Sequence, residues 1–229
     1  VRRWAFILQI VDNRVADIGG KGLNQALLLT RAGCPARLVA PIGRDDAGRR
    51  AEALAAEELA DAQLIKVDAP TDQSILYVAA TGENTIVSSA QAARSLSPAQ
   101  AQAALSEVEP GDTVLVQGNL SAQTTGAALR RARSVGAFCV ANPSPIQWPW
   151  SDLSELLDLV VVNRLELSEL AEPMGAEGAA ATLLEAGVGQ VLVTLGADGA
   201  EFWAQDERVY TPAAPVDVEQ NVFDPHPRH

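Results

Sequence analysis

Residues 17–33 read Asp-Ile-Gly-Gly-Lys-Gly-Leu-Asn-Gln-Ala-Leu-Leu-Leu-Thr-Arg-Ala-Gly, a turn of small residues that opens directly into a helical pattern. Three glycines within four positions let the backbone approach a ligand and adopt positive φ without strain. Lys21 places one cation among them. Asn24 lies just inside the helix, where free N–H groups and the positive dipole end favour anionic or hydroxylated ligands. From Leu23 onward apolar residues recur at helical spacing, and Gly33 predicts a C-terminal cap.

Taken alone, this glycine-rich loop fits two interpretations. The first is a solvated turn whose lysine has no role, because short glycine motifs match by chance often. The second is a ligand loop, although not a Walker A loop, since Gly-x4-Gly-Lys-Ser/Thr is absent. The string from Gly19 to Ala26 resembles the first signature of the ribokinase-like (PfkB) carbohydrate kinases, Gly-Gly-Lys-Gly-Ala-Asn-Gln-Ala. The resemblance implies contacts to a sugar from Gly19, Gly20, Lys21 and Asn24.

Composition limits the class of protein. The chain has 229 residues, of which 48% are hydrophobic and 20% charged, so it is typical of a globular protein with a full core. Its formal net charge of −12 would repel a nucleic-acid backbone or an anionic membrane surface. No apolar run approaches the ~18 residues of a membrane span. We therefore expect neither nucleic acid nor membrane as a partner.

Cysteine and histidine usage excludes several kinds of site. Cys34 and Cys139 are lone cysteines in apolar settings, which indicates a reduced, cytoplasmic protein without a disulfide framework. The only histidines, His226 and His229, lie at the end of the sequence, so no zinc motif or histidine triad can be built from them. Residues 1–13 combine two arginines with an apolar stretch but no cleavage pattern, and we interpret them as a strand rather than a secretory signal.

The first part of the chain predicts mixed elements. We expect a strand at 37–42, then Gly43-Arg44-Asp45-Asp46-Ala47-Gly48 and a helix over about 47–60, capped by Asp45 or Asp46. Three β-rich pieces follow at 64–67, 74–80 and 85–88. By resemblance the region of about 64–88 forms a small β lid that protrudes over the sugar. The whole chain is then a single ribokinase-like domain, incomplete at both ends.

From Ser97 the pattern alternates between helix and strand. Ser97 and Pro98 predict a helix start, and further helices are expected at about 124–135, 151–157, 165–171 and 177–186. Apolar strands are expected at 113–117, 138–141, 158–162 and 190–195. Such strands separated by helices predict a parallel sheet covered on both faces. The fold class is therefore α/β, and the resemblance implies a three-layer fold with a mainly parallel central sheet.

Polar residues follow each of these strands, at the edge where α/β sheets bind ligands. Each position could also be an ordinary turn. By resemblance, Asn119 contacts the sugar, in a place where ribokinases often hold a glutamate. Asn163 and Glu166 match the Asn-x-x-Glu motif, which organises Mg²⁺ and the phosphates of ATP, although the same pair could simply be a helix capping box. Thr194 and Gly196 match the nucleotide-side loop.

The resemblance covers about residues 17–217 and stops at Val216-Asp217. The Gly-Ala-Gly-Asp phrase that supplies the anion hole and catalytic base of the family does not follow, and its first sugar-binding phrase has no counterpart before Asp17. Losing a general base costs about 10² to 10⁴ in rate, so we expect weak or no phosphoryl transfer. Three hypotheses follow: an ATP-dependent kinase for ribose or a related sugar or nucleoside, a non-catalytic sugar-binding protein, and the product of a truncated or frameshifted gene. The apolar surface that the family's missing closing helices would have covered favours association, for example as a homodimer.

Overall fold

The computed structural model describes residues 19–78, 84–171 and 178–214. Contacts divide the chain into two compact units, Val1–Ser95 and Leu96–His229. A single domain over the whole chain stays a prediction. The strand expected within 1–13 and the partial motif at 216–217 lie outside the described residues. Within the described residues no helix has the length and apolarity needed to cross a membrane.

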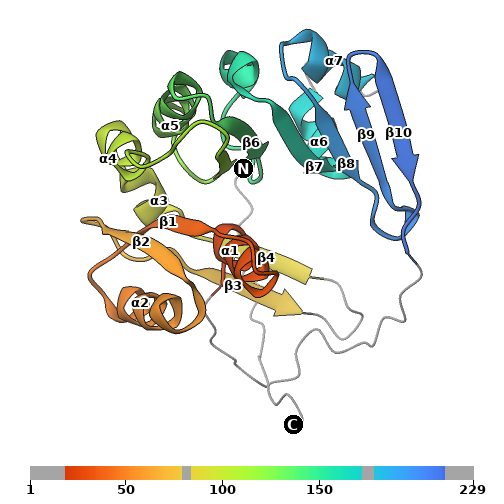
Figure 1. Ribbon diagram of the computed structural model, residues 1–229. Coiled ribbons are helices and arrows are strands. Elements are labelled where there is room, and N and C mark those ends of the chain that lie inside the picture. Colours follow the sequence, from red (N-terminus) through yellow and green to blue (C-terminus); the bar gives the residue numbers. More distant parts are fainter. Residues whose placement is uncertain (1–18, 79–83, 172–177, 215–229) are drawn as a thin grey trace, which may run out of the picture. The chain divides into compact units, whose positions relative to one another are not determined.

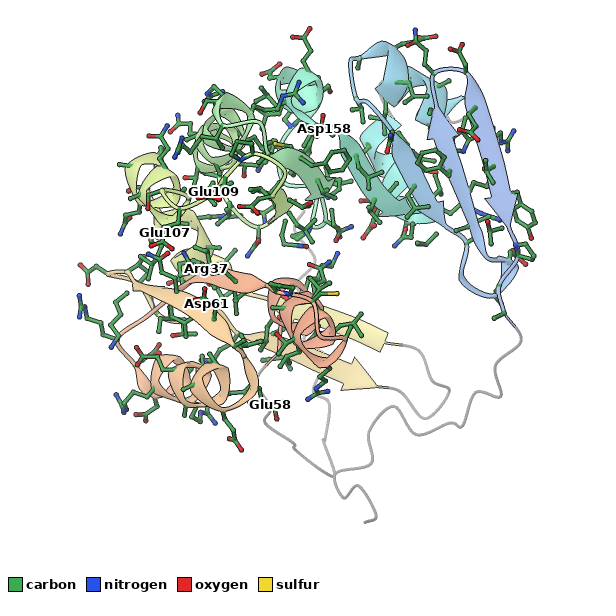
Figure 2. All side chains as sticks on the ribbon, viewed as in Figure 1. Arg37, Glu58, Asp61, Glu107, Glu109 and Asp158 are labelled. Carbon is green, nitrogen blue, oxygen red and sulfur yellow. The ribbon has the colours of Figure 1, made fainter. Side chains whose placement is uncertain are left out.

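The first unit is built on a pair of parallel strands. β1 (Arg37–Ile42) pairs with β2 (Asp61–Lys66), and α2 (Asp46–Glu58) forms the crossover between them (Figure 1). Arg37 and Asp61 are partners in this register, and their side chains form an ion pair of 2.6 Å (Figure 2). The apolar contacts of α1 (Lys21–Arg31) and α2 with this pair come from the following residues: Leu23, Ala26, Leu27, Leu38, Ala55, Leu59, Ala62 and Leu64.

The turn between β1 and α2 is held by a side chain from beyond β2. Asp45 caps α2 by accepting a hydrogen bond from the N–H of Gly48 at 2.9 Å. Thr71 donates both its N–H and its hydroxyl to the same carboxylate, at 2.8 and 2.6 Å. These donors, the Thr71 hydroxyl foremost, lower the pKa of Asp45 from 3.8 to about 2. The capping prediction is confirmed for Asp45.

Two of the three expected β-rich pieces form a small hairpin, and residues 79–80 of the first of these two lie outside the described residues. β3 (Ser74–Val78) and β4 (Asn84–Ser88) pair antiparallel. The first of the three β-rich pieces, expected at 64–67, falls largely within β2 and pairs with β1 instead of this hairpin. A local β pattern identifies a strand but not its partner, which explains the difference. The lid role of the hairpin stays a prediction.

The second unit contains a six-stranded sheet in the order β10-β9-β8-β7-β6-β5 (Figure 1). Four neighbouring strands are parallel: β5 (Thr113–Gln117), β6 (Phe138–Asn142), β7 (Leu159–Asn163) and β8 (Val191–Thr194). The sequence predicted all four. β9 (Ala200–Ala204) and β10 (Glu207–Thr211) add an antiparallel hairpin that the sequence analysis did not predict.

Helices enclose the apolar strands of this sheet. They are α4 (Pro98–Ala104), α5 (Ala122–Ser134), the 3₁₀ helix η1 (Ser151–Leu156), α6 (Arg164–Ala171) and α7 (Ala179–Glu185). Leu129 of α5, Cys139 of β6 and Val191 of β8 are fully buried in one core. Asp158, at the start of β7, ties α5 to β6 by pairing with Arg133 at 2.6 Å and accepting the N–H of Cys139 at 2.7 Å (Figure 2).

Candidate functional site

The glycine loop opens α1 as predicted. Gly20 is the N-cap with φ 129°, a conformation that favours glycine, and no side chain caps the helix end. The N–H of Asn24 bonds to the carbonyl of Gly20 at 2.9 Å, which starts the helical ladder. Lys21 and Asn24 are exposed on the first turn. At the other end Gly33 has φ 74° and completes a Schellman motif, which confirms the predicted cap.

The remaining candidates lie at one edge of the second unit's sheet. β5 and β6 end together, because Gln117 and Asn142 are partners in the register. β7 and β8 also end together, because Asn163 is the partner of Thr194. The carboxyl ends of four parallel strands therefore form one polar edge, as the sequence predicted.

Asn142, the last residue of β6, has a structural contact. Its side-chain amide donates a hydrogen bond to the carbonyl of Val161 at 2.8 Å, which joins β6 to β7. Asn119 differs from it. Its side chain is partly exposed and has no hydrogen-bond partner among residues 19–78, 84–171 and 178–214. The amide of Asn119 is thus available to a ligand.

Asn163 and Glu166 form the reciprocal pair of a helix capping box. The N–H of Glu166 donates to Oδ1 of Asn163 at 2.8 Å, and the N–H of Asn163 donates to Oε2 of Glu166 at 3.0 Å. The capping alternative is therefore real. It does not exclude a metal role, because each oxygen has a second lone pair and a carboxylate offers about four acceptor positions.

The same donor set suits a hydrated Mg²⁺. This ion keeps several waters and is commonly held through one or two carboxylates together with substrate phosphates. One carboxylate and one amide oxygen, fixed by backbone bonds at the N-terminus of α6, match that requirement. Among the described residues no three His, Cys, Asp or Glu side chains gather into a metal cluster.

The loop after β8 is anchored on several sides. The hydroxyl of Thr194 donates to the carbonyl of Val162 on β7 at 3.4 Å. Gly196 has φ 62°, and a Cβ built there would meet nothing within 4 Å, so its need for glycine is conformational and the surface above it is open. Asp198 carries two further contacts that sequence analysis missed: an ion pair with Arg164 at 3.6 Å and a hydrogen bond from Tyr210 to its carbonyl at 2.6 Å.

Comparison with known proteins agrees with the α/β sheet and its polar edge. The profile of the pfkB family of carbohydrate kinases matches residues 8–222. The chain belongs to this family. The resemblance seen at residues 19–26 is confirmed. The glycine loop lies in the first unit and the strand-end residues in the second, and their convergence on one ligand stays a prediction.

Similar proteins include several ribokinases. The ribokinase of Haemophilus influenzae is 29% identical over 188 residues, which cover 79% of this chain and 61% of that protein. The mouse ribokinase is 30% identical over 202 residues, covering 83% of this chain and 62% of that protein. The chain therefore spans about three fifths of the length of these two relatives.

Solved structures confirm the fold. The crystal structure of Thermotoga maritima ribokinase superposes with a TM-score of 0.74 at 28% identity, covering 86% of this chain and 67% of that one. Cryptococcus neoformans ribokinase in complex with ADP gives a TM-score of 0.68 at 30% identity, covering 86% and 68%. The α/β, ribokinase-like fold class predicted from the sequence is confirmed.

Proposed function

We propose that this pfkB-family chain binds ribose, or a related sugar or nucleoside, together with MgATP. The sugar-binding residues are Gly19, Gly20, Lys21, Asn24 and Asn119. The nucleotide side comprises Asn163, Thr194 and Gly196, with Glu166 for the magnesium ion. The observation that carries the proposal is the pairing of Asn163 with Thr194 at the polar edge of the sheet. Ribose is the first choice because the similar proteins named above are ribokinases.

The proposed sugar contacts use complementary hydrogen-bonding groups. The Lys21 ammonium donates to hydroxyl oxygens, while the amides of Asn24 and Asn119 can both donate and accept. The open glycine backbone around Lys21 lets these groups approach closely. A hydroxylated ligand presents alternating donors and acceptors, so this mixture suits it better than a purely anionic one.

On the nucleotide side, the residues of the chain would position the metal ion and the phosphates and would not themselves react. A bound Mg²⁺ would supply neutralisation of the phosphate charge of ATP. Glu166 and Asn163 would orient the hydrated ion, since their oxygens are already fixed by backbone bonds. The open surface at Gly196 would admit the phosphates close to the backbone.

The reaction class that follows is phosphoryl transfer from ATP to a sugar hydroxyl, and we infer that this 229-residue chain performs it weakly. The Gly-Ala-Gly-Asp phrase, which supplies the base in this family, does not occur among the 229 residues of the sequence. A missing base costs about 10² to 10⁴ in rate, and one missing anion-stabilising donor about 10² to 10³. Binding of sugar without ATP would instead favour a non-catalytic sugar-binding protein.

Calorimetric titration with D-ribose and with MgATP, followed by an ATP-consumption assay on pentoses, hexoses and nucleosides, tests the proposal. We expect both ligands to bind and turnover to stay below about 1 s⁻¹, the low end of ordinary kinases. Lys21→Met should remove ribose binding, while Lys66→Met serves as control, because Lys66 pairs with Glu52 on the surface. Absence of binding by both ligands would refute the proposal. Turnover above about 1 s⁻¹ would refute the inferred impairment. A cytoplasmic location and homodimer formation stay predictions.

A further inference from the structure

The loop after β6 encloses the short segment after β5 that contains Asn119. The N–H of Gly118 donates to the carbonyl of Ser144 at 3.3 Å. A Cβ on Gly118 would overlap the carbonyl oxygens of Pro143 and Pro145, so the two loops are in direct backbone contact. The residue before Asn119 is therefore fixed by the loop of residues 143–150.

The residue after Asn119 is fixed from the same loop. The indole Nε1–H of Trp148 donates to the carbonyl of Leu120 at 2.9 Å. One position further, Ser121 caps α5 by accepting the N–H of Thr124 at 3.1 Å. Asn119 thus has a held backbone on both sides, although its own side chain has no partner among the described residues.

Trp148 is itself anchored to the core. Its ring stacks on Trp150, with centroids 4.2 Å apart and planes 22° apart. Trp150 is 6% exposed and belongs to the core of the second unit. A rigid path therefore leads from the core through Trp150 and Trp148 to Leu120. A binding group loses less entropy on ligation when its backbone is already fixed in this way.

We propose that Trp148 is a positioning residue that holds Asn119 for the sugar. This inference rests on the proposed function, because it assumes that Asn119 is a sugar contact. Trp148 does not touch the ligand in this account. It acts through the carbonyl of Leu120, and its contribution disappears when the Asn119 amide is absent.

Trp148→Phe is the informative variant, because phenylalanine keeps an aromatic ring against Trp150 and removes the N–H donor. A hydrogen bond of this kind contributes little net free energy, so the ribose Kd should rise about 2- to 12-fold. The MgATP Kd should stay unchanged. The matched control is Trp203→Phe, which removes another indole hydrogen bond of the same unit, the one to Glu201 at 3.1 Å, and should leave both constants unchanged.

A double-mutant cycle with Asn119→Ala separates positioning from general stability. Calorimetry with D-ribose should show that Trp148→Phe causes no further loss once Asn119 is alanine. Hydrogen exchange should be faster at residues 118–121 in Trp148→Phe and unchanged in β7. An equal loss in both backgrounds, an equal loss for MgATP, or an unchanged ribose Kd would refute the positioning role alone. An unmodified chain that binds MgATP but no D-ribose would refute this inference alone, whereas a chain that binds neither ligand would refute the proposed function as well.

Discussion

Replacing Glu166 by glutamine and by alanine separates the two roles of this side chain. Glutamine also completes a capping box, so Glu166→Gln keeps the bond from the N–H of Asn163 and loses only the negative charge. Alanine loses both the bond and the charge. If Glu166 is only a cap, Glu166→Gln should bind MgATP as tightly as the parent chain does, with only a small loss of stability from the missing charge. If Glu166 also holds Mg²⁺, Glu166→Gln should bind MgATP more weakly than the parent chain does.

The magnitudes follow from the contacts. The charge at the N-terminus of α6 contributes about 0.3 to 1 kcal/mol, and the bond contributes about 0.5 to 1.5 kcal/mol. A change of 1 kcal/mol shifts Tm by about 2 to 4 °C at this size. We therefore expect Glu166→Gln to lower Tm by about 1 to 3 °C, and Glu166→Ala by about 2 to 8 °C. Loss of an outer-shell carboxylate should weaken Mg²⁺-dependent ATP binding about 10- to 100-fold in both variants.

Thermal unfolding and titration of ATP with and without Mg²⁺ provide the readouts. Gln100→Ala is the matched control, because Gln100 accepts the N–H of Ser97 at 3.0 Å in the capping box of α4. Gln100→Ala should lower Tm by an amount similar to that of Glu166→Ala and leave MgATP binding unchanged. Glu166→Gln that binds MgATP as tightly as the parent chain would refute the metal role and leave only the cap.

Three further substitutions, the last with a matched control, test the fold. Asp45→Asn should make the free energy of unfolding depend less on pH in the acid range. Because the pKa of Asp45 is lowered to about 2, the stabilisation it gives is present above pH 3.8 and is lost as pH falls toward 2. Urea unfolding between pH 5 and pH 2 measures this, and an equal pH dependence in variant and parent chain would contradict it. Gly118→Ala should destabilise by about 1 to 3 kcal/mol, since its Cβ would overlap two backbone carbonyls; unchanged stability in denaturant titration would show that the two loops are not in contact. Leu129→Ala should cost about 2 to 5 kcal/mol because Leu129 is fully buried, while Leu28→Ala, at a residue 69% exposed, should change stability by less than about 0.5 kcal/mol.

Local sequence signals predicted those elements whose boundaries are themselves local. β1 (Arg37–Ile42) and β5 (Thr113–Gln117) match their predicted ranges from end to end. Each is an apolar run closed by turn residues. The start of α4 was equally readable, because Ser97, Pro98 and Gln100 form its cap within four consecutive positions. In these cases no distant residue decides where the element begins.

Elements that depend on distant partners were missed or misplaced. α3 (Gln91–Ser95) has only five residues, and its first N–H groups are satisfied by Asp72, about twenty positions earlier. The hairpin β9–β10 mixes polar and apolar residues on both strands. Its cross-strand contacts include Arg208, which lies 4.0 Å over the ring of Trp203 and pairs with Glu201. The two turn residues 205 and 206 and the nearby aromatic residues were the only local signal.

In the candidate site, too, the sequence identified the residues but not the contacts that they make. Residue types and spacing identified Asn163 and Glu166, but the capping and metal-binding interpretations require the same two side chains at the same spacing. The structure shows why they coincide. Backbone N–H groups at the start of α6 hold one lone pair of each oxygen, and this fixes the direction of the remaining lone pairs. The cap thus fixes these oxygens under either interpretation, and only a substitution that keeps the cap while removing the charge can separate the two.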